Sequence, residues 1–241
     1  MHAHASIEPL AWETEFFALN SAKLNFSTAA PMLSEAELDA YALVQAKIPA
    51  QQTALVDGLT RLGFQLVEGE VDLVLNIGTE RASLDTEATQ AIRPAVPADI
   101  PMLRAAAASV FTASRFRAPW YHSQDSGRFY AEWIEKAVLG TFDHQCLLAL
   151  DPTGQPEGFV SLRELDGQEA RIGLLAAFPG AAGKGIGSRL MAAAMAECRS
   201  LQRLRVATQF GNIAALRLYQ RQGAVIESTS YWLYRGRHDS I

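Results

Sequence analysis

The stretch AAGKGIGSRL, residues 181–190, places three glycines and a lysine within five consecutive positions. It follows the strand-like run RIGLLAA and leads into an apolar run, which predicts a helix beginning near Ser188. Gly183, Gly185 and Gly187 permit positive φ angles, so a ligand can approach the backbone closely. Because the first amides of a helix have no partner within it and attract anions, this loop is either an ordinary turn or a cradle for a pyrophosphate.

Two common nucleotide-binding loops do not fit this spacing. A P-loop has Ser or Thr directly after its lysine, whereas Gly185 follows Lys184 here. A Rossmann loop opens an early parallel β-α-β unit, whereas this loop comes late in the chain, after a predicted meander of strands. A phosphate held here would therefore be bound in some other fold, mainly through backbone amides and with Lys184 adding a charge.

A polar segment without apolar periodicity, residues 78–90, predicts a domain boundary between a first domain over 1–80 and a second over 91–241. The first domain is expected to be small and α/β. Its sequence predicts a capping box at the start of its first helix, with Ser34 as N-cap and Glu37 three residues later. The elements predicted here are a strand over 22–28, helices over 33–48 and 53–64, and a strand pair or one long bent strand over 65–77.

The second domain shows a clearer alternation of helices and strands. Asp99 is expected to be the N-cap of its first helix, and Asp166 with Gly167 predicts a tight turn between two strands. The predicted elements are helices over 97–111 and 126–140, strands over 145–151, 157–165 and 169–177, the glycine loop, a helix over 188–200, a strand over 204–208, a helix over 212–223, and a final strand or strand pair over 224–235.

The composition is typical of a globular protein and leaves a small anionic ligand possible, since such a ligand needs only a local basic patch. The chain has 241 residues, and its 21 basic against 26 acidic residues give a formal charge of −5, which argues against nucleic acid. No apolar run reaches the roughly 18 residues of a membrane-spanning helix, and the first residues lack a secretory pattern. Cys146 and Cys198 stand far apart in no metal-ligand spacing. We expect a cytoplasmic protein with no metal, membrane or nucleic acid as partner.

A second segment with candidate catalytic residues is GNIAALRLYQRQGA, residues 211–224. On a helix, Asn212, Ala215 and Tyr219 share one stripe, with Asn212 as the N-cap and Gly223 as the terminator. A phenol on such a stripe is either a core aromatic or a proton donor. Together with the glycine loop and the order of the elements, this spacing favours a catalytic role for Tyr219.

Both segments resemble the GNAT superfamily of acetyl-CoA-dependent N-acetyltransferases, whose elements follow the same order. Both glycines of the superfamily's loop motif Q/R-x-x-G-x-G/A are present in residues 182–187, with Ala182 where Gln or Arg is usual. The downstream motif N-x-x-A-x-x-x-Y-x-x-x-G is matched along residues 212–223. The resemblance implies an α/β chain with the GNAT fold, a mixed and mostly antiparallel sheet flanked by helices, together with a smaller N-terminal α/β domain.

The resemblance also implies roles for individual residues, with acetyl-CoA as cosubstrate and no metal. Tyr219 would donate a proton to the leaving sulfur, and a backbone amide on the strand before the glycine loop, at Leu175, would meet the thioester oxygen. The residues implied in cofactor binding are Leu175, Gly183, Lys184, Gly185, Ile186, Gly187 and Asn212.

Longer stretches, among them ASIEPL, SRFRAPWY and ESTSYWLYR, are similar to the members of this superfamily that act on a dTDP-linked amino sugar. This similarity covers essentially the whole chain. It implies acetyl transfer to the 4-amino group of dTDP-4-amino-4,6-dideoxy-D-galactose, in the biosynthesis of enterobacterial common antigen. The partners would then be two small molecules, acetyl-CoA and the sugar nucleotide, and an exposed edge of the final strands suggests a homodimer.

The acceptor requires a base for its amine and a site for its diphosphate. Glu68 and Glu70 share one side of a strand, and we favour Glu68 as the base, with a solvated strand face as the alternative. The stretch SRFRAPWYH offers guanidinium groups for phosphate and rings for thymine, unless it is an exposed basic turn over core aromatics. The residues predicted to bind the sugar nucleotide are Arg115, Arg117, Trp120 and Tyr121.

Two other functions are compatible with these residues. A GNAT enzyme acting on a protein or another amine would share the same loop, because the loop chemistry does not name the acceptor. A non-catalytic sensor that binds acyl-CoA would also share it. The presence of Tyr219 with Asn212 argues against the sensor, since a protein that only binds has no need of a proton donor.

Overall fold

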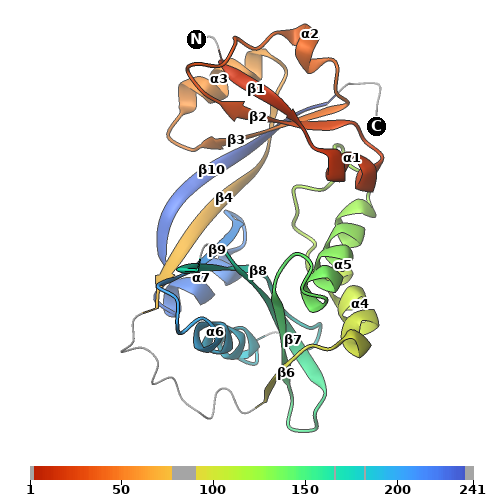
Figure 1. Ribbon diagram of the computed structural model, residues 1–241, viewed down its shortest axis with the longest axis vertical. Helices are drawn as coiled ribbons and strands as arrows, with labels where there is room; N and C mark the ends of the chain where they lie inside the picture. The colour runs from red at the N-terminus through yellow and green to blue at the C-terminus, as the bar shows by residue number, and fades with distance from the viewer. Residues whose placement is uncertain (1–2, 78–90, 166, 182, 237–241) are drawn as a thin grey trace.

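The computed structural model describes residues 3–77, 91–165, 167–181 and 183–236, and Figure 1 shows their arrangement. The elements are β1 (Ala5–Pro9), α1 (Ala11–Phe17), β2 (Ser21–Phe26), α2 (Glu35–Leu38), β3 (Leu43–Pro49), α3 (Thr53–Arg61), β4 (Gln65–Asn76), β5 (Ile92–Pro94), a 3-10 turn (Pro97–Asp99), α4 (Ile100–Val110), α5 (Asp125–Val138), β6 (Gln145–Leu150), β7 (Pro156–Glu164), β8 (Glu169–Ala177), α6 (Ile186–Glu197), β9 (Arg203–Gln209), α7 (Ile213–Arg221) and β10 (Val225–Gly236).

These ten strands form one sheet in the order β1-β2-β3-β10-β4-β9-β8-β7-β6-β5. The pairs β2/β3 and β8/β9 are parallel and the other neighbours are antiparallel, which confirms the predicted mixed, mostly antiparallel sheet. The twelve-residue strands β4 and β10 pair along most of their length and connect the N-terminal part with the larger part (Figure 1). The boundary predicted in 78–90 lies outside the described residues and stays a prediction, while the sheet itself continues through both parts.

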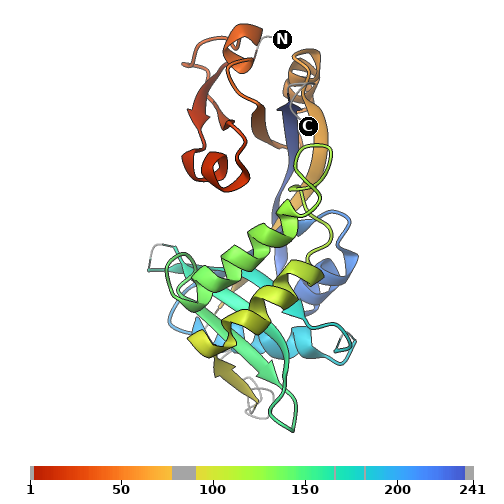
Figure 2. The ribbon, with the colours of Figure 1, turned by 90° about the vertical axis from the view of Figure 1, so that its right-hand side faces the viewer.

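Helices cover both faces of the sheet in the larger part (Figure 2). On one face α6 and α7 pack against β8 and β9, with Leu190 and Val206 in the shared core. On the other face α4 and α5 pack against β6 and β7, with Ile134 and Phe159 in that core. The N-terminal part has a core of its own around Phe64. The sheet therefore separates two apolar layers, and any opening between its strands connects them.

The long helix predicted over 33–48 is wrong. The capping box does form, since Ser34 Oγ accepts from the Glu37 amide, but the helix ends at Leu38 and the chain then forms strand β3. The apparent helical spacing arose from side chains that are buried for a different reason, because β3 is held between β2 and β10 in the sheet. The elements β1, α1 and β5 were not expected from the pattern.

Three smaller expectations also differ from the structure. Asp99 is the N-cap residue of α4, as predicted, but its side chain makes no capping hydrogen bond, because the carboxylate binds Arg93 and the Val96 amide at the preceding 3-10 turn. Helix α6 begins at Ile186, two residues before the expected start. The final strand offers no exposed edge, because β10 lies between β3 and β4 and the sheet edges are β1 and β5. Asp166 of the predicted turn lies outside the described residues.

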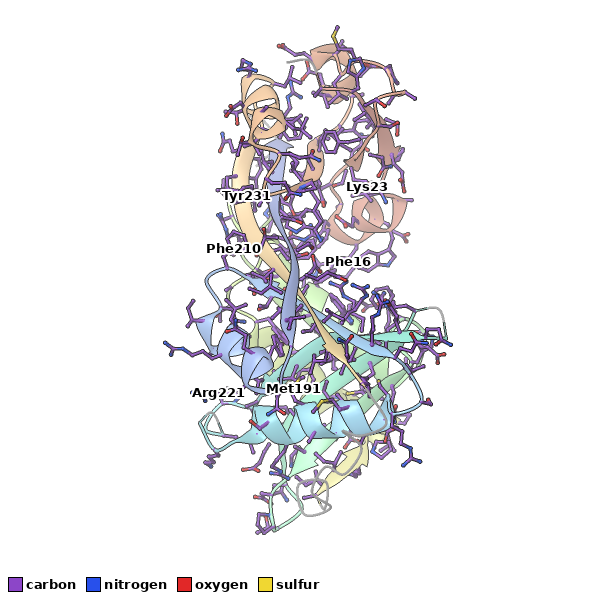
Figure 3. All side chains as sticks on the ribbon, turned by 90° about the vertical axis from the view of Figure 1, so that its left-hand side faces the viewer. Phe16, Lys23, Met191, Phe210, Arg221 and Tyr231 are labelled. Carbon is purple, nitrogen blue, oxygen red and sulfur yellow. The ribbon has the colours of Figure 1, made fainter. Side chains whose placement is uncertain are left out.

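An aromatic cluster fills the junction between the N-terminal part and the larger part. Helix α1 contributes Trp12 and Phe16, whose rings stack at 4.9 Å, and Phe16 lies at the level where the two parts meet (Figure 3). Phe17 of the same helix stacks on Phe116, and Phe129 of α5 lies 4.2 Å from the Phe116 ring. These contacts fix α1 against the start of α5.

Candidate active site

Strands β8 and β9 pair only at their first residues and then diverge. Their parallel ladder ends at Ile172 opposite Val206, although β8 continues to Ala177 and β9 to Gln209. On its other edge β9 stays paired with β4 along its whole length, from Arg203 opposite Asn76 to Gln209 opposite Glu70. The opening between the strands is a cleft of about 460 Å³. It is lined by parts of the glycine loop, α5, α7, β4, β8 and β9.

A β-bulge in β8 shapes one wall of this cleft. The register with β7 shifts between Val160 opposite Leu175 and Leu162 opposite Ile172, so β8 carries one extra residue. The bulge reverses the faces of the strand. Ile172 lies in the core under α6 and α7, whereas Leu174 lies in the core under α4 and α5. Leu175, predicted to offer its amide to the thioester oxygen, follows the bulge and lines the cleft.

A buried carboxylate, Asp143, holds the bulge in place. Its Oδ2 accepts from Trp133 Nε1 at 2.8 Å and from Ser161 Oγ at 2.6 Å, and Ser161 Oγ accepts from the Leu174 amide at 2.9 Å. A Cβ at Gly173 would lie 2.2 Å from Asp143 Oδ2, so only glycine lets the carboxylate approach the backbone this closely. The sequence pattern gave no signal for this arrangement, because its members come from separate elements.

The glycine loop meets the geometric demands of an anion site. Gly183 and Gly185 both have a φ of +81°, and a Cβ at either would meet nothing within 4 Å. Gly185 stands at the N-cap of α6 without a side-chain cap, so the first amides of the helix are available to a ligand. Gly187 differs, because it lets α6 approach Leu218 of α7, whose Cδ2 would lie 2.9 Å from an added Cβ.

The other predicted loop residues take different positions. Lys184 is exposed, whereas the Ile186 side chain is 2% exposed and belongs to the core, so only the backbone of Ile186 can face a ligand. Gly183 and Gly187 line the cleft. Ala182, where the motif departs from the usual Gln or Arg, lies outside the described residues.

Helix α7 presents Asn212 and Tyr219 to the same cleft. Asn212 is the N-cap, as predicted, and its Oδ1 accepts from the Ala215 amide at 3.1 Å. Tyr219 is 5% exposed, and burial raises its pKa to about 12. Its phenol is therefore fully protonated near neutral pH and is suited to donate a proton rather than to accept one.

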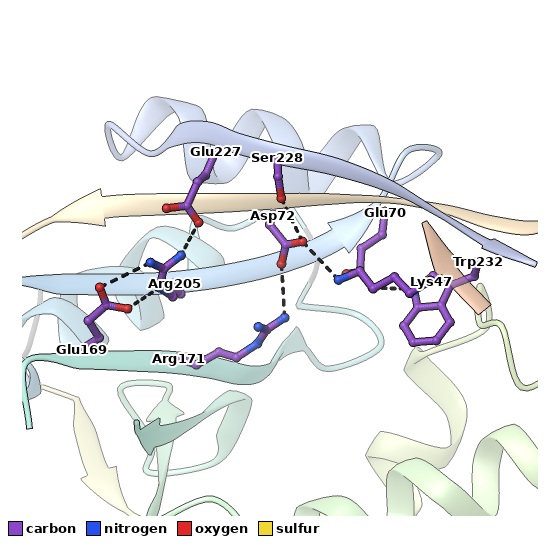
Figure 4. A network of polar contacts seen from close by, with 9 residues as sticks. All are labelled: Lys47, Glu70, Asp72, Glu169, Arg171, Arg205, Glu227, Ser228 and Trp232. Carbon is purple, nitrogen blue, oxygen red and sulfur yellow. Dashed lines mark hydrogen bonds and ion pairs between the residues drawn. The ribbon is translucent and has the colours of Figure 1, made fainter. Parts of the chain in front are cut away.

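Glu68 and Glu70 of β4 both line the cleft, as their shared parity predicted. Desolvation by burial raises the pKa of Glu68 to about 7, against the opposing effect of the Arg115 charge. Glu70 is already engaged, since it accepts from Lys47 Nζ at 2.5 Å and from Trp232 Nε1 at 3.0 Å (Figure 4). A pKa of about 7 suits Glu68 to act as a base at neutral pH, and no ion pair to Glu68 is found among the described residues.

Arg115 lines the cleft and is held by two hydrogen bonds and two aromatic rings. One guanidinium nitrogen donates to Gln45 Oε1 at 2.9 Å and to the Tyr234 hydroxyl. The group also lies over the rings of Phe116 and Trp232, at 4.2 and 4.1 Å from their centroids. The sequence pattern could not indicate Trp232, because β10 comes near this loop only through the sheet.

The other residues predicted for the sugar nucleotide do not line the cleft. Arg117 donates to the carbonyl oxygens of Ala118 and Val67. Trp120 and Tyr121 are 7% and 3% exposed and pack in the aromatic junction. The structure gives both rings a packing role, which was the stated alternative, and their role in binding thymine stays a prediction.

The described residues include no group of three or more His, Cys, Asp or Glu side chains that could hold a metal ion. Over the same part of the chain, no helix is long and apolar enough to cross a membrane. Cys146 and Cys198 are both buried and free.

Comparisons with known proteins agree with this geometry. The sequence model of the acetyltransferase (GNAT) family matches residues 108–224. A dTDP-fucosamine acetyltransferase of Escherichia coli O6:H1 (strain CFT073) is 51% identical over 237 residues, which cover 98% of this chain and 100% of that protein.

Among solved structures, a conserved protein of unknown function from Staphylococcus epidermidis has a TM-score of 0.61 at 16% identity. That match covers 98% of this chain and 92% of the other chain. A GCN5-related N-acetyltransferase from Sphaerobacter thermophilus has a TM-score of 0.55 at 18% identity. That match covers 80% of this chain and 59% of the other chain. These two show the fold, and the close relative shows the family. The diverging strands, the glycine loop and the matched sequences together show that the chain belongs to the GNAT family of acetyltransferases.

Proposed function

We propose that the protein transfers the acetyl group of acetyl-CoA to the 4-amino group of dTDP-4-amino-4,6-dideoxy-D-galactose. The proposed acceptor is supported by the 51% identity, over essentially both whole chains, with a protein named dTDP-fucosamine acetyltransferase. The cleft supports the reaction class, because a protonated phenol and a carboxyl with a pKa of about 7 line the same opening.

The glycine loop would hold the pyrophosphate of acetyl-CoA. The backbone amides at the start of α6, beside Gly183 and Gly185, would donate to the phosphate oxygens, and exposed Lys184 would add a positive charge. The pantetheine arm would then enter between β8 and β9. The Leu175 amide would meet the thioester oxygen, where a donor of this kind contributes on the order of 3 kcal/mol to the transition state. Asn212 would orient the start of α7 beside the arm.

The chemistry is aminolysis of a thioester. The amine nitrogen forms a bond to the acetyl carbonyl carbon, and the bond between that carbon and sulfur breaks. Glu68 takes the proton that the nitrogen loses, directly or through a water. Tyr219 donates its proton to the departing sulfur, which leaves as the free thiol. Solvent exchange then returns a proton to the phenolate and removes one from Glu68, so the site is restored.

The biological setting follows from the acceptor. The acetylated sugar would be used in the biosynthesis of enterobacterial common antigen, and the reaction would take place in the cytoplasm, where acetyl-CoA is available. The homodimer stays a prediction.

Release of the CoA thiol tests this function. The purified chain is given acetyl-CoA with the dTDP-linked 4-amino sugar, with other nucleotide amino sugars, or with a peptide panel. We expect rapid release with the dTDP-linked 4-amino sugar alone. Release with peptides only would establish a different acceptor class, and acetyl-CoA binding without turnover of any amine would establish a sensor.

A further inference from the structure

A second cavity of about 510 Å³ lies between α1, α5 and the loop that follows α5. Its volume is within the range of roughly 300–1,000 Å³ that is usual for small-molecule sites. Arg115, Phe129 and Trp133 line both this cavity and the catalytic cleft, so the two spaces share one wall. The complete lining of the second cavity is Trp12, Glu13, Arg115, Phe129, Glu132, Trp133, Lys136, Thr141 and Phe142.

Aromatic rings dominate the outer part of this cavity. Trp12 and Phe142 are each 44% exposed, so part of each ring is accessible to a ligand. The Phe142 ring meets Trp133 edge-on, with centroids 5.5 Å apart, and the Trp12 ring stacks on Phe16. Long charged side chains also lie over these rings, since Lys136 Nζ is 4.7 Å from the Trp12 centroid and the Arg163 guanidinium is 4.6 Å from the Phe142 centroid. A planar ligand would stack on the rings by taking the place of these side chains.

Two acidic and two basic side chains line the cavity. Glu132 is paired with Arg104 and Lys136. Glu13 accepts from the neutral amide of Gln45 at 2.6 Å and also attracts the Arg115 guanidinium. Arg115 stands at the wall shared with the cleft, where little water competes for its guanidinium group. A fixed, desolvated guanidinium is a strong partner for a phosphate.

The order of these features matches the order of groups in a nucleotide sugar. Resting on the proposed function, we infer that the second cavity binds the thymidine end of the acceptor. The amino sugar lies in the cleft beside Glu68, the diphosphate contacts Arg115 at the shared wall, and the thymine ring stacks among Trp12, Trp133 and Phe142. The N-terminal helix α1 thereby supplies part of the acceptor site.

A third cavity, beside β2 and β3, fits this role less well. It contains Lys23 and Lys47, but Lys23 pairs with Glu8 at 3.1 Å and Lys47 pairs with Glu70 at 2.5 Å. It shares only one lining residue, Trp232, with the cleft. Its basic groups are neutralised, and its contact with the cleft is narrow.

Inhibition by free dTDP tests the inference in the full-length enzyme. In the wild type we expect dTDP to compete with the sugar nucleotide and not with acetyl-CoA. Trp12→Ala and Phe142→Ala should each raise the inhibition constant of dTDP and the KM of the sugar nucleotide by about tenfold, since base stacking contributes at that level. Trp12→Phe keeps a stacking ring and should restore most of the affinity. Leu139→Ala changes an exposed residue that does not line the cavity and should behave as the wild type.

Two further readouts separate the possible failures. An unchanged KM for acetyl-CoA shows that the variants are folded, and turnover of the same amino sugar as a methyl glycoside should be equal in wild type and variants. If the wild type acetylates the sugar nucleotide but the cavity variants keep wild-type affinity for dTDP, the inference is overturned and the function stands. If the wild type acetylates no nucleotide sugar, the function fails, and calorimetric binding of dTDP to the same variants still decides whether the cavity is a nucleotide site.

Discussion

The hydroxyl of Ser161 on β7 links the buried Asp143 carboxylate to the bulge of β8, since it donates to Oδ2 at 2.6 Å and accepts from the Leu174 amide at 2.9 Å. One side chain thus couples a carboxylate with no exposed surface to the strand segment that opens the cleft. We expect the direction of the Leu175 amide to depend on this link, although Ser161 itself does not line the cleft.

Ser161→Ala should weaken both the fold and the cleft. It leaves the Leu174 amide and one acceptor site of Asp143 without a partner, which costs about 1–3 kcal/mol of unfolding free energy. Because the bulge is expected to position the cosubstrate, the variant should also have a higher KM for acetyl-CoA or a lower kcat. Its KM for the acceptor should stay unchanged. Urea denaturation and steady-state kinetics measure these effects. Ser109→Ala, at an exposed site, is the control, and loss of stability with wild-type kinetics would limit Ser161 to a structural role.

Tyr219→Phe should lower kcat by roughly 10²- to 10⁴-fold, the usual contribution of a general acid. The phenylalanine ring keeps the packing of a side chain that is 5% exposed, so the dissociation constant of CoA should be unchanged. Rapid-quench kinetics together with calorimetry separate the two quantities. A kcat near the wild-type value would remove the proposed role of the phenol.

Glu68 should set the acidic limb of the pH profile. Burial raises its pKa to about 7, so the carboxyl is protonated and inactive as a base at pH 6, and kcat/KM should rise with pH and level off above about 7. Glu68→Gln should lower kcat/KM and remove this inflection, leaving only the ionisation of the amine itself. In Glu70→Gln the inflection should persist, and its loss there instead would assign the base to Glu70.

Burial of Glu68 should also make the stability of the fold fall as the pH rises. Because the folded pKa of Glu68 is raised above 4.5, folding favours the neutral carboxyl, and its contribution is full below pH 4.5 and is lost as pH rises through about 7. Glu68→Gln stays neutral, so its Tm should exceed that of the wild type at pH 8 and approach it at pH 5. Calorimetric melts at both values measure the gap, with exposed Glu15→Gln as the control. A gap that does not depend on pH would contradict this burial effect.

The parts of the site that lie close together in the sequence could be predicted. The glycine loop, the Asn212 cap and the position of Tyr219 each depend on a short segment, and the structure brings these segments to one cleft. Glu68 was selected over Glu70 only slightly from the sequence. The structure separates them through the partners of Glu70, Lys47 and Trp232, which come from distant strands.

The parts that depend on strand pairing could not be predicted. The segment 33–48 has apolar residues at spacings that suit a helix, but β3 pairs with β10, which lies far along the chain, and the sheet decides its conformation. Asp143, and the residues of the second cavity other than Arg115, belong to no local motif. Trp12 reaches Phe129 only because α1 packs against α5.

Gly185→Ala should damage cosubstrate binding more than it damages the fold. Gly185 has a φ of +81° with open space beyond it, so an alanine meets no atom but adopts a left-handed backbone, which costs about 1–2 kcal/mol. Gly154 is a matched control, since its φ is +85° and its surroundings are equally open, but it lies in the turn between β6 and β7. Both alanine variants should lose similar unfolding free energy in urea, because the backbone strain is the same. Only Gly185→Ala should raise the KM for acetyl-CoA, since the strain there turns the first amides of α6 away from the pyrophosphate. Equal KM values for the two variants would show that these amides do not bind the cosubstrate.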